Sequence, residues 1–148
     1  MKILVSALEP SSNLHLKELL KHTNDLELYG IFDKNIGSPL YDISQMAIMG
    51  VVDALKKLRW FYRVADEMVE LASKCDKVLL MDGSGFNLPL AKKIKEKYPN
   101  KEIIYYILPQ VWASRPKRVI KLEKYCDKLL GILPFEINMY KSGKAKYV

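Results

Sequence analysis

The order of strands and helices along this chain of 148 residues predicts an α/β fold with a doubly wound, mostly parallel sheet. Short apolar runs alternate with longer stretches whose apolar residues recur at helical spacing, and this alternation is typical of parallel sheets covered by helices. The run Val78–Met81 is apolar throughout, as expected for a strand that is buried on both faces. Asp82 follows it directly and would stand at the carboxyl end of that strand, where parallel sheets bind their ligands.

The first half of the chain supplies two predicted strands and two predicted helices. Residues 2–8 and 26–32 are short apolar runs and are predicted as strands. Between them, residues 9–13 form a loop rich in helix-capping side chains, and leucines at helical spacing extend a helix from Leu14 to about Thr23. A long helical stretch then runs from about Ser44 to Lys74.

The second half continues the same alternation. Its predicted strands are residues 77–81, 102–108 and 127–133, and a last strand begins at Ala145. Its predicted helices are residues 86–98, a helix that begins at Pro116, and residues 135–141. Five such units imply right-handed crossovers with helices on both faces of the sheet. Because the last strand begins so close to Val148, we expect the chain to be the N-terminal part of a longer protein.

Size and composition indicate one globular domain, since 49% of the residues are hydrophobic. No segment has the roughly 18–20 consecutive apolar residues of a membrane span, and no signal-peptide pattern follows Met1, so we expect a cytoplasmic protein. Cys75 and Cys126 are isolated, and neither His15 nor His22 has acidic residues or cysteines clustered around it. The sequence therefore indicates no metal site and no disulfide, and we expect no cofactor.

Glycine-rich phosphate-binding motifs do not occur in the sequence. The loop at residues 8–13, after the first predicted strand, lacks the glycines of a dinucleotide-binding turn, and there is no P-loop. These observations argue against a nicotinamide-dependent dehydrogenase and against a P-loop ATPase or GTPase. The net charge of +7 favours an anionic partner, which is nucleic acid, a lipid headgroup or a phosphorylated substrate.

Asp82 is the first candidate for chemistry. Gly83 and Gly85 allow a tight turn and leave its carboxylate uncrowded, so that it could accept a proton from a substrate hydroxyl as a general base. From spacing alone, a helix cap or a turn residue is an equally good interpretation.

A second candidate segment follows the predicted strand at 102–108, near the same edge of the sheet as Asp82. Its polar, aromatic and basic residues are Gln110, Trp112, Arg115, Lys117 and Arg118. These residue types are suited to bind phosphate or sugar, and the alternative is a solvated basic helix face with Trp112 as a packing anchor.

The stretch from Ala47 to Val64 combines a broad apolar face with basic residues. The apolar face comprises Val51, Val52, Leu55, Leu58, Phe61 and Tyr62, and the basic residues beside it are Lys56, Lys57, Arg59 and Arg63. This pattern predicts a helix that associates with an anionic membrane surface, although an ordinary core-packing helix is equally compatible with it. Nucleic acid is not expected as a partner, because the basic residues accompany an apolar face rather than aromatic residues spaced for base stacking.

Four segments together resemble the lipid-A-disaccharide synthases, bacterial glycosyltransferases that join two acylated glucosamines. They are residues 47–55 (AIMGVVDAL), 81–87 (MDGSGFN), 106–113 (YILPQVWA) with 117–119 (KRV), and 133–136 (LPFE). Their order and spacing match across essentially the whole chain. The resemblance implies a two-domain architecture of the GT-B kind. Residues 1–148 would form its N-terminal, Rossmann-like acceptor-side half, and the C-terminal UDP-sugar-binding half would be absent from this chain.

The resemblance also implies an activity. The family condenses UDP-2,3-diacylglucosamine with 2,3-diacylglucosamine 1-phosphate, inverts the anomeric centre and releases UDP, without a metal. Asp82 matches the family's proposed general base, which takes the proton from the 6-hydroxyl of the acceptor. The positions that match sugar- or phosphate-binding residues are Glu9, Ser11, Asn13, Asn87, Gln110, Trp112 and Arg118. The apolar helix implies peripheral association with the inner face of the inner membrane, and the family allows a homodimer of the full-length protein.

The chain departs from the family's usual pattern in three places. Ser11-Ser12-Asn13 stands where members commonly have Ser-Gly-Asp, Ser84-Gly85 where they have Pro-Asp or Pro-Ala, and Ser114 where they have a second tryptophan. Because the second half would hold most of the groups that bind the leaving UDP, we expect the chain alone to be inactive or nearly so. The alternative to a glycosyltransferase is a non-catalytic basic Rossmann-like module that binds anionic lipid or nucleic acid.

Overall fold

A single sheet of six parallel strands forms the centre of the molecule. A computed structural model describes residues 1–49, 53–111 and 116–148, and its strand order is β2-β1-β3-β4-β5-β6. The strands are β1 (Lys2–Ala7), β2 (Glu27–Ile31), β3 (Lys77–Met81), β4 (Glu102–Tyr106), β5 (Lys128–Gly131) and β6 (Ala145–Tyr147). The predicted α/β class with a parallel sheet is therefore confirmed, and the strand predictions are correct to within one or two residues at each end.

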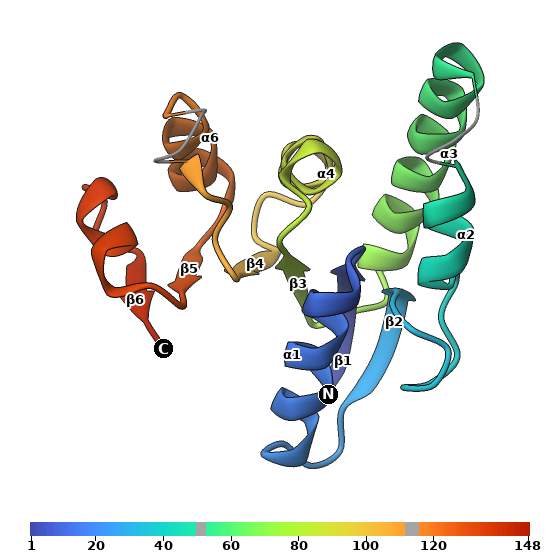
Figure 1. Cartoon of the computed structure of the whole chain (residues 1–148), viewed down its shortest axis with the longest axis horizontal. Helices are drawn as coiled ribbons and strands as arrows, with labels where there is room; N and C mark the ends of the chain where they lie inside the picture. The colour runs from blue at the N-terminus through green and yellow to red at the C-terminus, as the bar shows by residue number, and fades with distance from the viewer. Residues whose placement is uncertain (50–52, 112–115) are drawn as a thin grey trace.

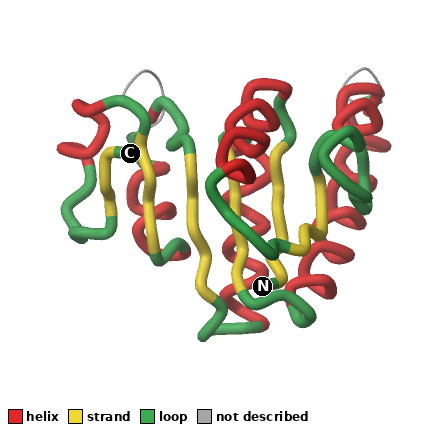
Figure 2. Tube along the Cα trace, turned by 90° about the horizontal axis from the view of Figure 1, so that it is seen from below, coloured by secondary structure: helices red, strands yellow, loops and turns green. Residues whose placement is uncertain are grey.

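Helices cover both faces of this sheet, as the doubly wound prediction requires. They are α1 (Pro10–Lys21), α2 (Ile43–Met49), α3 (Ala54–Ala72), α4 (Ser84–Lys97), α6 (Arg118–Tyr125) and the 3₁₀ helix η1 (Pro134–Met139). Figures 1 and 2 show α1 on one face, with α3, α4 and α6 on the other. Each face has its own apolar core: Leu16 of α1 packs with Val5 and Phe32, whereas Met68 of α3 and Ile94 of α4 belong to the larger core.

The prediction of one helix from about Ser44 to Lys74 is wrong. The structure has two helices there: α2 ends at Met49 and α3 begins at Ala54. Asp53 has non-helical backbone angles, and its carboxylate accepts a hydrogen bond from the amide of Leu55 at 3.2 Å, which makes it the N-cap of α3. The hydrophobic pattern continues through this cap, and for that reason spacing alone could not detect the break.

Other helix ends also differ from the prediction: α4 begins at Ser84 instead of Phe86, and α6 begins at Arg118 instead of Pro116. Two further differences have local reasons. The first helix begins at Pro10 instead of Leu14, because proline is well accommodated in the first turn of a helix. The last predicted helix, residues 135–141, is the 3₁₀ helix η1 over Pro134–Met139. Neither difference changes the topology.

Asn13 joins three elements beneath the carboxyl edge of the sheet. Its buried side-chain amide donates to the carbonyl oxygens of Ala7 and Glu9, both at 2.9 Å, and its Oδ1 accepts from the amide of Asp33 at 2.7 Å. One side chain thus ties the end of β1, the start of α1 and the residues that follow β2. Because both the amino group and the oxygen of this buried side chain are hydrogen-bonded, we expect Asn13 to stabilise the folded chain.

We predict that Asn13→Ala destabilises the chain by about 1–3 kcal/mol, because it leaves buried backbone groups without partners. Urea unfolding followed by circular dichroism measures this change. Ser11→Ala is the matched control: Ser11 is exposed on the same helical turn and should change stability by no more than about 0.5 kcal/mol. Equal unfolding midpoints for Asn13→Ala and the unaltered chain would contradict the role assigned to Asn13.

Candidate active site

The centre of the sheet contains a topological switch point between β1 and β3. The chain leaves β1 toward α1 on one face and leaves β3 toward α4 on the other, so the two connecting loops diverge at the carboxyl edge (Figure 1). Open parallel sheets bind their ligands at this kind of position. Gly83, after β3, has a φ of +47°, and a Cβ there would lie only 2.8 Å from Cδ1 of Leu8 after β1. A side chain at this position would be strained by the left-handed backbone and would displace the end of the Leu8 side chain, so glycine is favoured here.

Asp82 stands at this edge in a left-handed backbone conformation, with a φ of +47°. It is half-buried and lines a pocket of about 300 Å³, the polar pocket, at the carboxyl ends of β3, β4 and β5. The residues lining the polar pocket are Asp82, Ser84, Ile107, Leu108, Pro109, Gln110, Val111, Arg118, Ile132, Leu133 and Glu136. Three of the predicted site residues, Asp82, Gln110 and Arg118, therefore meet in one cavity.

The guanidinium group of Arg118 lies in the same pocket and is held by α4. Its Nη1 donates a hydrogen bond to the hydroxyl of Ser84, the first residue of α4. The pocket thus contains the carboxylates of Asp82 and Glu136, either of which could accept a proton, and the cation of Arg118, which could hold an anionic group, together with the amide side chain of Gln110. This combination suits a phosphorylated or hydroxyl-rich ligand.

Glu136 was not predicted as a site residue, although it lies in the polar pocket. It is only 3% exposed, and its Oε2 accepts a hydrogen bond from the amide of Leu133 at 3.3 Å, at the start of η1. The signal in the sequence was the LPFE motif: proline at the first position of a short helix with glutamate two residues later places a carboxylate beside the helix start. From the sequence, this motif was used only as one of the four segments that resemble the family, and Glu136 was not assigned to the site.

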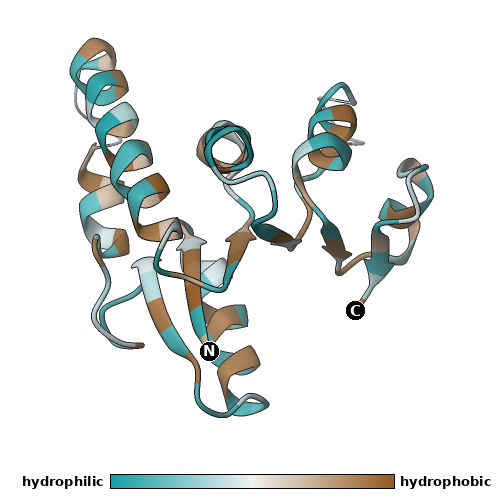
Figure 3. Ribbon diagram, turned by 180° about the vertical axis from the view of Figure 1, so that it is seen from behind, coloured by the Kyte–Doolittle hydropathy of each residue, from teal (hydrophilic) through white to brown (hydrophobic). Residues whose placement is uncertain are grey.

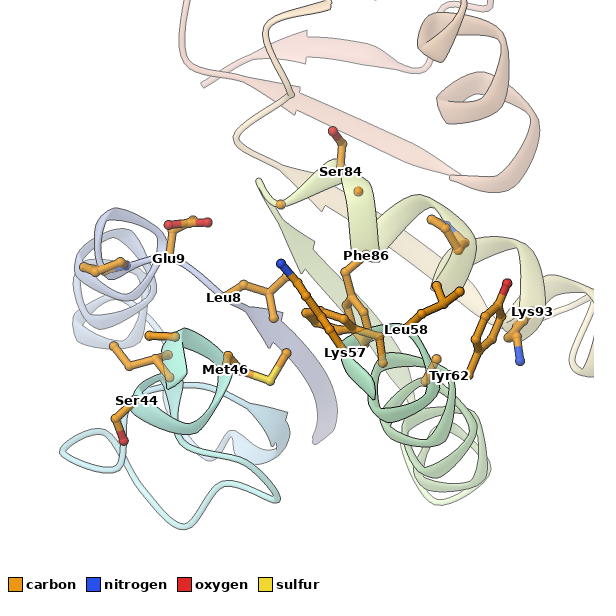
Figure 4. Close-up of a pocket in the computed structure, with 18 residues that line it drawn as sticks. Leu8, Glu9, Ser44, Met46, Lys57, Leu58, Tyr62, Ser84, Phe86 and Lys93 are labelled. Carbon is orange, nitrogen blue, oxygen red and sulfur yellow. The ribbon is translucent and has the colours of Figure 1, made fainter. Parts of the chain in front are cut away.

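A second, larger pocket of about 760 Å³, the apolar pocket, lies on the other side of the α4 start. Four parts of the chain enclose it: α2, the first half of α3, the start of α4 and the loop after β1. Figure 4 shows Leu8, Met46, Leu58 and Phe86 gathered around one space, with Lys57 among them. The Nζ atom of Lys57 lies 5.7 Å from the centre of the Phe61 ring. Ser84 lines both pockets, so the polar and apolar cavities are neighbours.

Of the apolar residues predicted to face a membrane, those that the structure describes lie in the first half of α3. Leu58, Phe61 and Tyr62 line the apolar pocket, and Leu55, Leu58 and Tyr62 are 60%, 52% and 56% exposed. The last turns of α3 are buried instead, through residues such as Val64 and Met68. Figures 1 and 3 show the first turns of α3 projecting beyond the sheet. Val51 and Val52 lie outside the described residues.

The other predicted binding residues have varied positions. Glu9 is exposed at the rim of the apolar pocket, and Ser11 is exposed on α1 and lines neither pocket. Asn13 and Asn87 are buried, and their amides bind backbone carbonyls, so that both lie beneath the site. Trp112 lies outside the described residues.

Two further properties of the described part of the chain concern ligands and membranes. Within residues 1–49, 53–111 and 116–148, no group of three or more His, Cys, Asp or Glu side chains is arranged to hold a metal ion. None of the helices in these ranges is both long enough and apolar enough to cross a bilayer.

Comparison with known proteins gives a consistent set of relatives. The family of lipid-A-disaccharide synthetases matches residues 3–148. The lipid-A-disaccharide synthase of Helicobacter pylori strain G27 is 51% identical over 147 residues, which cover 99% of this chain and 40% of that protein. The synthase of Helicobacter acinonychis strain Sheeba is 50% identical with the same coverage. The synthase of Campylobacter jejuni strain RM1221 is 37% identical over 158 residues, which cover 98% of this chain and 43% of that protein.

The chain therefore spans about two fifths of the length of these relatives. The family match covers nearly every residue of the chain, and it includes all four segments that carry the resemblance. The chain belongs to the lipid-A-disaccharide synthetase family.

Proposed function

We propose that this chain is the N-terminal, acceptor-side half of a lipid-A-disaccharide synthase of the GT-B kind. The observation that carries the proposal is the position of Asp82: a half-buried carboxylate at the switch point, in a polar pocket with Arg118 and Gln110. Membership in the family supports the reaction class. The longer protein of which this chain would be the first part is termed the complete enzyme.

The proposed reaction joins two lipid-linked sugars. The 6-hydroxyl of 2,3-diacylglucosamine 1-phosphate attacks the anomeric carbon of UDP-2,3-diacylglucosamine from the face opposite the nucleotide. The bond from that carbon to the UDP oxygen breaks, UDP leaves with the electron pair, and the anomeric configuration inverts. Asp82 accepts the proton of the attacking hydroxyl as general base. Arg118 and Gln110 would hold a phosphate or sugar group of the acceptor in the polar pocket.

The apolar pocket supports acylated substrates. It adjoins the polar pocket at Ser84, so a sugar in one pocket could place an attached acyl chain in the other. Lys57 lines this pocket, and exposed Leu55 and Leu58 lie on the same helix. We propose that the first turns of α3 associate with the inner face of the cytoplasmic membrane through these residues, with the net charge of +7 favouring anionic lipid.

We predict that Asp82→Asn lowers transfer by the complete enzyme about 10²–10⁴-fold, because an amide cannot accept the proton. Asparagine tolerates the left-handed conformation, so the fold should persist, as circular dichroism would verify. Asp25→Asn is the matched control: Asp25 is exposed, far from the pockets, and also left-handed, with a φ of 59°. The readout is UDP release. Near-normal turnover by Asp82→Asn would refute the proposed function.

We also predict that the 148-residue chain alone releases no UDP above background from the two proposed substrates. The groups that stabilise the departing diphosphate would belong to the second half. The measurement compares the chain with the complete enzyme at equal concentration. Steady turnover by the chain alone would contradict the division of the active site between two halves.

A third prediction concerns the membrane. The double variant Leu55→Ser with Leu58→Ser should reduce binding of the chain to phosphatidylglycerol vesicles at least about tenfold, since burying one leucine contributes about 1.5–3 kcal/mol. The control is Leu14→Ser, because Leu14 is 71% exposed but lies on α1, on the opposite face of the sheet. Binding should persist at high salt if apolar insertion dominates. Unchanged vesicle binding by the double variant would exclude α3 as the contact.

A further inference from the structure

The main-chain carbonyl of Asp82 accepts hydrogen bonds from two buried side chains. The amide Nδ2 of Asn87, on α4, donates to it at 2.9 Å. The hydroxyl of Tyr105, on β4, donates to the same oxygen. Both side chains are fully buried, with 0% exposure. A side chain of the following helix and one from the neighbouring strand thus fix the orientation of one peptide group, the one that joins Asp82 to Gly83.

This peptide group needs to be fixed because its conformation is unfavourable. Asp82 and Gly83 both have a φ of +47°, and a residue with a side chain loses about 1–2 kcal/mol in the left-handed region. The amide of Asp82 donates a long hydrogen bond, 3.4 Å, to the carbonyl of Tyr106, and the carbonyl of Gly83 accepts from the amides of Phe86 and Asn87 at 3.1 and 3.0 Å. The bonds to the Asp82 carbonyl add to these and act on the Asp82–Gly83 peptide directly.

Tyr105 is suited to this role by its place in β4. Because side chains alternate along a strand, Tyr105 points into the core beneath α4, whereas Tyr106 points to the opposite face. Burial raises the pKa of the Tyr105 hydroxyl well above its usual range, so the group stays protonated and remains a donor. Asn87 makes further bonds to the carbonyls of Met81 and Ser6, at 3.1 and 3.4 Å.

We propose that Tyr105 is a positioning residue for Asp82: its hydroxyl, together with the amide of Asn87, locks the Asp82–Gly83 peptide and so aims the Asp82 carboxylate into the polar pocket. The inference rests on the proposed function, in which Asp82 is the general base. Tyr105 itself does not line the polar pocket, and it acts only through the backbone of Asp82. Loss of its hydroxyl should therefore affect the rate of proton removal more than the binding of substrate.

The test is Tyr105→Phe in the complete enzyme, since phenylalanine keeps the ring and removes only the donor. We expect kcat to fall about tenfold, because misplacing a catalytic group by about 1 Å costs up to 100-fold, with KM unchanged within about twofold. The matched control is Tyr140→Phe. Tyr140 is also buried, but its hydroxyl has no hydrogen-bond partner among the described residues, so its loss should leave kcat unchanged.

A double variant separates positioning from general stability. In the Asp82→Asn background, Tyr105→Phe should lower the residual turnover no further, because there is no base left to aim. Asn87→Ser removes the other donor to the Asp82 carbonyl together with the bonds to Met81 and Ser6, so kcat should fall at least as far. Its loss should likewise not add to that of Asp82→Asn, and this variant tests the inference if Tyr105→Phe fails to fold.

Three results would overturn the inference: normal kcat for Tyr105→Phe, an equal loss in the Asp82→Asn background, or an equal loss for Tyr140→Phe. The two proposals fail separately. Active Asp82→Asn refutes the proposed function, whereas inactive Asp82→Asn with normal Tyr105→Phe refutes only the role of Tyr105.

Discussion

The side-chain amide of Asn87 holds together the point at which the two central strands end. It donates to carbonyls of β1, of β3 and of the turn that follows β3, namely those of Ser6, Met81 and Asp82. At a switch point, the connections that follow two neighbouring strands leave toward opposite faces of the sheet. Asn87, on α4, bridges the ends of both strands there. The left-handed residues Asp82 and Gly83 lie at this same junction.

The start of α4 also separates two cavities of opposite character. On one side the polar pocket presents Asp82, Arg118 and Gln110, and on the other the apolar pocket presents Phe86, Leu58 and Met46. Ser84 belongs to both, and Arg118 binds its hydroxyl. A ligand with a charged sugar and a hydrocarbon chain is the kind of molecule that can fill both spaces at once. For this reason, the proposed function assigns an amphiphilic substrate to the site instead of a small polar one.

The sequence alone was sufficient to predict the sheet and the edge at which Asp82, Gln110 and Arg118 meet. Residues 77–81 were predicted as a strand and form β3 without change, because a continuous apolar run has few other interpretations. Asp82, Gln110 and Arg118 were correctly expected at one edge, since parallel strands place all their carboxyl ends together. Contacts distant in sequence could not be predicted in this way. Asn87 reaches Ser6 across 81 positions, and Tyr105 reaches Asp82 across 23, and no local pattern records either pairing.

Helix α3 divides into a half that packs on the sheet and a half that extends beyond it. The helix has 19 residues and is about 28 Å long at 1.5 Å per residue, whereas a five-residue strand such as β3 spans only about 17 Å. A helix packed on this sheet must therefore overhang it by roughly two turns. The packed half buries Val64, Met68 and Ala72, and the overhanging half exposes Leu55 and Leu58. Packing against the core therefore explains the apolar residues of the packed half, but not those of the overhanging half. The exposed leucines, beside the apolar pocket and Lys57, are the observation behind the proposed association of α3 with lipid.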